Sequence, residues 1–106
     1  MNELTDLEIC QRIAEIENRV ISGIGSLNVF VKCEPSQVGN EQYDPLADDA
    51  LCFRLMLKYD MPPMKSETNN LYDCVFDINK AISGAGIISN ESPHKAICLA
   101  IIKSKE

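Results

Sequence analysis

Apolar and polar residues follow helical spacing near the beginning of the chain. Between positions 6 and 17, apolar side chains recur every three or four residues, and charged residues lie on the other side. Thr5 and Glu8 have the spacing of a capping box, in which each side chain bonds a free backbone N–H of the first turn. The pattern predicts an amphipathic helix over 6–17. Its buried stripe is expected to contain Ile9, Cys10, Ile13, Ala14 and Ile16.

A second helical pattern lies near the end of the chain. Ser92 is a short polar cap, and Pro93 is tolerated at the first position of a helix. Residues 96–102 are all apolar, while Lys103 suits the negative end of a helix. We therefore predict a helix over 93–103, which is too apolar to lie free in water and must dock on a sheet or on other helices.

A third helix is expected in the middle of the chain. Asp44 provides a cap, Pro45 suits the first helical position, and the segment Asp60-Met61-Pro62-Pro63 ends the helix. The apolar residues of this helix are expected to face the core, namely Leu46, Ala50, Phe53 and Leu57, widened by Cys52 and Met56. We accordingly expect Phe53→Ala, like Ile97→Ala in the last helix, to cost about 2–5 kcal/mol of stability.

Strand patterns occupy the intervening segments. Residues 27–33 are rich in β-formers, and residues 72–78 alternate between apolar and polar side chains. Residues 81–88 contain Gly84 and Gly86 and read either as a bulged edge strand or as the end of a short helix. We favour a hairpin that turns near residues 79–80, and we expect loops at 34–43 and 64–70, with the break after the first helix marked by Asn18, Gly23 and Gly25.

These elements predict an α+β fold in one domain over residues 1–106. Three helices pack on a small three-stranded sheet, in the order α-β-α-β-β-α. The chain has 106 residues, of which 45% are hydrophobic and 25% charged, as in an ordinary globular domain. It contains no apolar run that would span a membrane and no apolar signal core, so a cytoplasmic location is expected.

Charge is distributed unevenly along the chain. The net charge is −6; residues 1–50 carry ten acidic and three basic residues, whereas residues 51–106 carry six acidic and seven basic residues. An acidic first half disfavours contact with nucleic-acid phosphates. It is compatible with a basic protein partner, with mimicry of nucleic acid, or with an acidic surface that only solvates the fold.

No combination of residues predicts a catalytic, cofactor or metal site. The five cysteines have no CxxC pair and only His94 to accompany them, so they are interpreted as small hydrophobic residues. Asp44, Asp48 and Asp49 are interpreted as helix-cap residues, and the two Gly-x-Gly fragments at 23–25 and 84–86 as turns or bulges. The rival hypothesis is a small-molecule-binding or hydrolytic protein that uses His94 and nearby acids in a pocket beside the C-terminal helix.

Two groups of residues are candidates for contact with another protein. Met61 and Met64 flank two prolines in a predicted loop, where flexible apolar side chains either form an adaptable contact or tuck under the helix end as a lid. The acidic candidates are Glu15, Glu17 and Asp48, whose charge reversal is expected to weaken binding without unfolding the chain.

Three stretches together resemble the small proteins of tailed bacteriophages and prophages known as phage ABA-sandwich domains. The stretches are residues 4–9 (LTDLEI), 43–50 (YDPLADDA) and 93–100 (PHKAICLA). They cover helix starts and helix packing, while a middle-strand tryptophan is missing and residues 34–42 form extra loop. The resemblance implies a phage accessory protein in the bacterial cytoplasm, and it assigns no residue a role. Together with the missing catalytic residues, it favours a non-enzymatic module that binds a host factor or itself.

Overall fold

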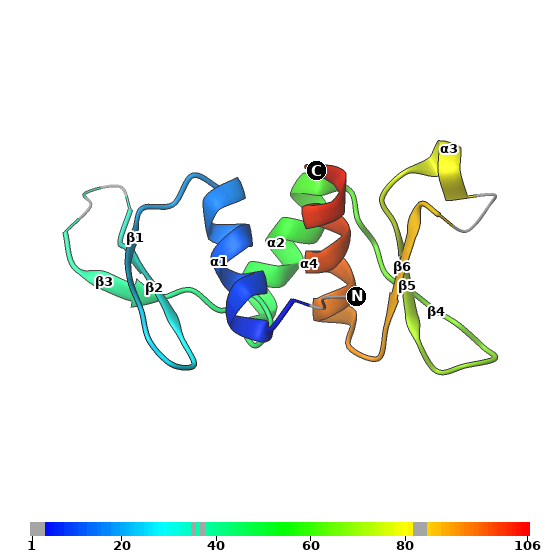
Figure 1. The fold of residues 1–106 in the computed structure, drawn as a ribbon, viewed down its shortest axis with the longest axis horizontal. Coiled ribbons are helices and arrows are strands. Elements are labelled where there is room, and N and C mark those ends of the chain that lie inside the picture. The colour runs from blue at the N-terminus through cyan, green and yellow to red at the C-terminus, as the bar shows by residue number, and fades with distance from the viewer. Residues whose placement is uncertain (1–3, 35, 37, 82–84) are drawn as a thin grey trace.

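The fold has a layer of helices between two small antiparallel sheets (Figure 1). It is a computed structural model that describes residues 4–34, 36, 38–81 and 85–106. The molecule is elongated, with extents of 45 × 25 × 24 Å. One sheet lies beyond α1 and the other beyond α4, so the helical layer provides the core for both ends.

The described residues form four helices and two three-stranded sheets. The helices are α1 (Asp6–Ile16), α2 (Asp49–Tyr59), α3 (Ile78–Ala81) and α4 (Pro93–Ser104). The first sheet contains β1 (Ile21–Ile24), β2 (Val29–Lys32) and β3 (Asn40–Gln42), in that order. The second contains β4 (Met64–Lys65), β5 (Tyr72–Val75) and β6 (Ile87–Asn90), in that order.

The prediction of an α+β fold is confirmed, but the prediction of three helices on one three-stranded sheet is wrong, because the described residues form four helices and two small antiparallel sheets. The expected strands at 27–33 and 72–78 are present as β2 and β5. The sequence missed β1, β3 and β4, which lie at sheet edges and are almost wholly exposed. Such strands are held mainly by backbone hydrogen bonds. Their sequences therefore lack the alternation of apolar and polar residues by which a half-buried strand is predicted.

Helix α4 is the centre of the packing, as its apolar sequence predicted. It contacts α1, α2, β5 and β6. Six of its side chains are buried: Ala96, Ile97, Cys98, Ala100, Ile101 and Ile102. Ser92 caps the helix by accepting a hydrogen bond from the Lys95 backbone N–H at 3.3 Å. The docking of a strongly apolar terminal helix is therefore confirmed.

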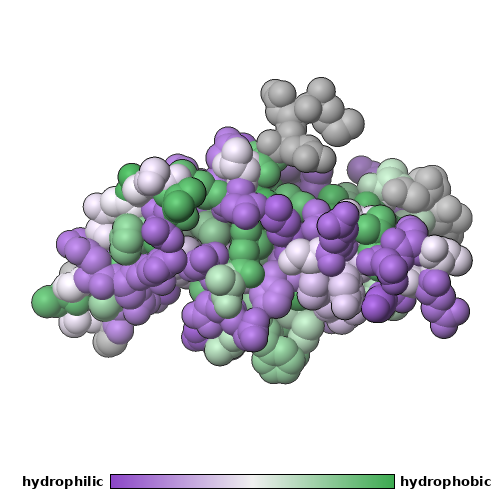
Figure 2. Space-filling view, turned by 90° about the horizontal axis from the view of Figure 1, so that it is seen from below, coloured by the Kyte–Doolittle hydropathy of each residue, from purple (hydrophilic) through white to green (hydrophobic). Residues whose placement is uncertain are grey.

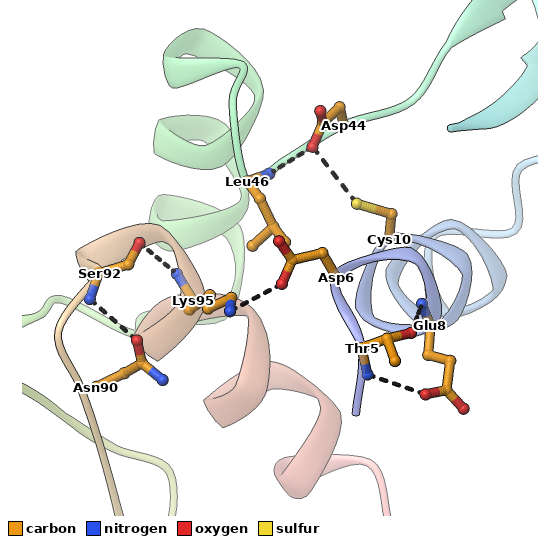
Figure 3. Close-up of polar contacts among 9 residues, drawn as sticks. All are labelled: Thr5, Asp6, Glu8, Cys10, Asp44, Leu46, Asn90, Ser92 and Lys95. Atoms are coloured by element: carbon orange, nitrogen blue, oxygen red, sulfur yellow. Dashed lines mark hydrogen bonds and ion pairs between the residues drawn. The ribbon is translucent and has the colours of Figure 1, made fainter. Parts of the chain in front are cut away.

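Helix α1 begins with the predicted capping box (Figure 3). The Thr5 hydroxyl accepts from the Glu8 backbone N–H at 3.2 Å, and the Glu8 carboxylate accepts from the Thr5 backbone N–H at 2.9 Å. The backbone bond from Thr5 lowers the pKa of Glu8. Ile9, Ile13 and their neighbours Cys10 and Ala14 are buried, which confirms the predicted stripe.

Helix α2 begins later than predicted. Its cap is Asp48, whose carboxylate accepts from the Leu51 backbone N–H at 3.1 Å. Asp44 instead closes a separate turn, because its carbonyl accepts from the Asp48 backbone N–H at 2.8 Å. Its carboxylate accepts from the Leu46 backbone N–H and from the Cys10 thiol (Figure 3). Asp44 and Asp48 both have the side chain of a helix cap, and the prediction chose Asp44, whereas only Asp48 starts a helix.

The predicted core face of α2 is also wrong. Cys52 and Leu55 are buried, whereas Phe53 is 57% exposed and Leu57 is 62% exposed. Apolar residues occupy both sides of this helix, so spacing alone does not choose between them. Placing Leu46 in the helix selected the wrong side, since Leu46 lies in the turn before it.

The connection between β5 and β6 combines both alternatives raised by the sequence. Helix α3 is a single short turn, and β6 then pairs antiparallel with β5 from Ile87 onward. Gly84 lies outside the described residues, while Gly86 is buried against the start of α3. The expected loop at 34–43 likewise contains β3 and the buried Tyr43, with residues 35 and 37 outside the description.

Candidate functional site

A groove of about 460 Å³ runs between α1, β6 and α4. Its apolar floor consists of Leu4, Ile9, Ile88, Leu99 and Ile102. Its polar rim consists of Arg12, Ser89, Asn90, Lys95, Lys103 and Glu106. The groove thus joins an apolar surface to a rim that carries three cations and one carboxylate, on a chain with a net charge of −6.

The periodicity of α4 creates one wall of this groove. Lys95, Leu99 and Lys103 lie four residues apart and therefore share one stripe of the helix. Lys95 and Lys103 are eight residues apart, which corresponds to about 12 Å along a helix. The groove consequently offers positive charge along its length, with apolar side chains between.

Two of the three rim cations have internal ion-pair partners. Lys95 Nζ lies 2.8 Å from an Asp6 carboxylate oxygen (Figure 3), and Lys103 Nζ lies 3.8 Å from a Glu106 carboxylate oxygen. For Arg12, the described residues provide no ion pair within 4.0 Å. Exposed pairs are worth at most about 1 kcal/mol, so a bound carboxylate can replace or share them.

The outer face of α2 is a second uncovered surface. Phe53 and Leu57 are one helical turn apart, and Arg54 is exposed beside them. We call these three residues the α2 surface. Hydrophobic residues also reach the face seen in Figure 2, where they lie between hydrophilic ones. On the α2 surface, two large apolar side chains project from one helix whose opposite face is buried.

The three acidic contact candidates have different roles. Glu15 is exposed on α1, and its side chain has no hydrogen bond or ion pair within the described ranges. Asp48 caps α2, and Glu17 accepts hydrogen bonds from Lys58 at 2.8 Å and from the Tyr59 hydroxyl. Reversing all three charges would therefore also remove a helix cap and a hydrogen-bonded pair, so that triple variant cannot isolate binding.

The two methionine candidates are separated by the structure. Met61 is 6% exposed, and its carbonyl accepts a hydrogen bond from the buried Cys74 thiol at 3.1 Å. Burial raises the pKa of Cys74 to about 11, so this thiol remains a donor at neutral pH. Met61 therefore fits the lid alternative. Met64 is 59% exposed in β4, where it remains accessible.

Glu17 joins the end of α1 to the end of α2. Partial burial alone would raise the pKa of Glu17, but the hydrogen bonds from Lys58 and Tyr59 outweigh it and the pKa is lowered. A carboxylate with a lowered folded-state pKa stabilises the fold above its unfolded-state pKa, near 4.3 for glutamate. That contribution is lost as the pH falls through the lowered folded-state value.

We predict that Glu17→Gln lowers the free energy of unfolding by about 1 kcal/mol at pH 7. Glutamine keeps an acceptor for Tyr59 but loses the charge that pairs with Lys58. Urea unfolding from pH 7 to pH 3 should show that the difference from the parent protein shrinks below about pH 4.3. The matched control is Glu15→Gln, which should change stability by less than about 0.5 kcal/mol. A constant difference at every pH would contradict the charge contribution.

His94 contacts an acid, as the rival hypothesis required, but it does not line the groove between α1, β6 and α4. Its Nε2 lies 2.7 Å from an Asp49 carboxylate oxygen across the α2–α4 contact. Cys52 and Cys98 lie nearby, and their hydrogen bond together with burial raises the pKa of the Cys98 thiol. His94 is absent from the linings of the groove and of two other hollows, of about 580 and 430 Å³. The arrangement therefore provides a contact between α2 and α4.

The described ranges also bear on metal binding and on insertion into a membrane. No three His, Cys, Asp or Glu side chains group closely enough to hold a metal ion. No described helix combines the length and apolar content needed to cross a bilayer. All five cysteines are free thiols, and burial raises the pKa of Cys10 to about 12. These cysteines act as small apolar residues or weak donors, in agreement with the sequence interpretation.

Comparison with models of protein families, with curated proteins and with solved structures finds no match for this chain. The groove and the α2 surface are thus defined by the geometry of this molecule alone. The sequence did not identify either one. The groove combines residues from three separate segments, while the α2 residues were assigned to the core. The spacing of Lys95, Leu99 and Lys103 was the one sequence signal that could have indicated the groove.

Proposed function

We propose that this chain is a small non-enzymatic protein-interaction module, of the kind that tailed bacteriophages and prophages encode, which binds a host protein through the α2 surface. The observation that supports this proposal is the exposure of Phe53 and Leu57 one turn apart on a helix. Large apolar side chains gathered on a surface are typical of contact sites, because burying them on association is favourable. The phage setting comes from the resemblance of the three sequence stretches.

The charge of this surface favours a partner that carries carboxylates. Arg54 is exposed between the two apolar side chains along the helix, and the described residues give it no ion pair. In a two-fold contact centred on this surface, the Arg54 side chains of two copies would approach each other. Repulsion between them disfavours a second copy as the occupant. An acidic side chain beside an apolar strip on another protein complements the surface.

A photo-crosslinking residue at position 57, introduced in bacterial cells, tests this proposal. We expect one adduct of defined mass at position 57 and none when the same residue replaces the exposed Thr68 in a distant loop. Adding Phe53→Ser or Arg54→Glu to the position-57 protein should reduce the adduct at least about fivefold, as expected for loss of a central contact.

Three results of the crosslinking experiment would contradict the proposal. Equal adducts at positions 57 and 68 would indicate nonspecific contact. An adduct with twice the mass of the chain would identify a second copy as the occupant. Adducts that Arg54→Glu leaves unchanged would exclude a partner chosen by its carboxylates. Thermal unfolding of each variant checks that the fold is retained, which exposed positions on a helix should allow.

A further inference from the structure

We infer that the groove between α1, β6 and α4 binds an extended peptide segment in which two carboxylates flank an apolar side chain. This inference rests on the proposed function only in that the ligand is part of a protein. It concerns a different stripe of α4 from the one that packs on α2, where His94 meets Asp49. The groove and the α2 surface can therefore be tested separately.

The distribution of charge identifies the ligand class. The groove lining carries Arg12, Lys95 and Lys103 against the Glu106 side chain, although the chain as a whole is acidic. With Asp6, which pairs with Lys95 from outside the lining, three cations still face only two carboxylate side chains. Opposite charge on the ligand is therefore favoured at this surface, and positive charge is disfavoured. Leu4, Ile88 and Leu99 are the half-buried apolar residues of the floor, and they would cover an apolar side chain of the ligand.

The spacing of the cations favours a peptide over a small amphiphile with one carboxylate. Lys95 and Lys103 are about 12 Å apart along α4. A single carboxylate reaches one of them, whereas carboxylates at positions i and i+4 of an extended peptide are about 13 Å apart. The side chain at position i+2 points to the same side as both acids. The sequence acid-x-apolar-x-acid therefore places its three side chains against the rim, the floor and the rim.

The neighbouring strand suits an extended ligand. Strand β6 is at the edge of its sheet, and Ile88, Ser89 and Asn90 from this strand line the groove. An edge strand presents backbone groups along one side, and peptides commonly bind there in extended form. The apolar and charged positions of α4 lie opposite, so one segment can contact both walls.

The test uses fluorescence anisotropy with a labelled peptide of sequence Glu-Ala-Phe-Ala-Glu, measured at low salt. We expect saturable binding that weakens as salt is added. Replacing both glutamates with glutamine, or moving the phenylalanine by one position, should weaken binding at least about fivefold. The first change removes the charges, and the second turns the ring to the other side of the peptide.

Protein variants give effects in opposite directions. Lys95→Gln and Lys103→Gln should each weaken binding about threefold to fivefold, because each removes a cation from the rim. Glu106→Gln should strengthen binding about twofold to fivefold, because it removes the carboxylate that competes for Lys103. Lys65→Gln, outside the groove, is the matched control and should have no effect. Circular dichroism verifies that each variant is folded.

Three results would overturn the inference. One is the absence of binding, and another is equal binding of the glutamate and glutamine peptides. The third is binding of dodecanoate in place of the peptide, which would assign the groove to single-chain amphiphiles. None of these outcomes affects the crosslink at position 57. Loss of that crosslink with retained peptide binding would contradict only the proposed role of the α2 surface.

Discussion

Ile97→Ala should lower the free energy of unfolding by about 2–5 kcal/mol, whereas Phe53→Ala should lower it by less than about 1 kcal/mol. The sequence predicted the same cost for both. Ile97 is 5% exposed in α4, the helix that contacts α1, α2 and the second sheet. Truncating its side chain therefore leaves a cavity in the core. Phe53 is mostly in water, so truncating it removes little packing.

Urea unfolding of the two variants at pH 7 measures this difference directly. Leu57→Ala provides a second exposed control on α2, and it should behave like Phe53→Ala. If Phe53→Ala costs as much as Ile97→Ala, then the α2 surface is covered within the folded chain and cannot serve as a docking face. The same measurement therefore tests the fold and a premise of the proposed function.

The successes of the sequence prediction have a common physical basis. Helices α1 and α4 each combine a cap signal with a continuous run of apolar positions, and local hydrogen bonds and burial then agree. Strands β2 and β5 were found because part of each faces the core. Where local and tertiary signals coincide, a short window of sequence is sufficient.

The failures arise where tertiary packing makes the choice. Helix α2 has apolar residues on two sides, and only the position of α4 determines that Leu55 is buried and Phe53 is not. Strand β3, with the polar sequence of residues 40–42, exists because β2 offers its edge. Its register pairs Phe30 with Gln42 and Lys32 with Asn40. No local property of this polar segment would indicate a strand.

The groove could not be predicted for a related reason. Arg12, Lys95 and Lys103 were interpretable from the sequence only as solvated charges or helix-end charges. Their shared place on the groove depends on the packing of α1 against α4 and on β6, which leads into α4. The charge totals did not indicate the groove either. The acidic first half instead predicted Glu15, Glu17 and Asp48 as contact residues.

Gly86→Ala should destabilise the protein by about 1–3 kcal/mol, while Gly23→Ala should change stability by less than about 0.5 kcal/mol. A Cβ atom on Gly86 would overlap the Asp77 carbonyl and lie 3.1 Å from the Ala81 backbone nitrogen. The backbone cannot easily move away, since the Gly86 carbonyl accepts from the Phe76 backbone N–H at 2.9 Å.

At Gly23, by contrast, a Cβ atom meets nothing within 4 Å, so the same substitution there is a matched control. Urea unfolding gives the overall cost for both variants, and hydrogen exchange at the Phe76 amide shows where it arises. Faster exchange at Phe76 in Gly86→Ala, with exchange in α1 changed only by the overall loss of stability, would place the strain in the turn between β5 and β6. Equal stabilities of the two alanine variants would show that this turn opens without cost, and glycine at position 86 would then need another explanation. The close approach of two backbone segments, which only glycine permits, is the reason we expect the first result.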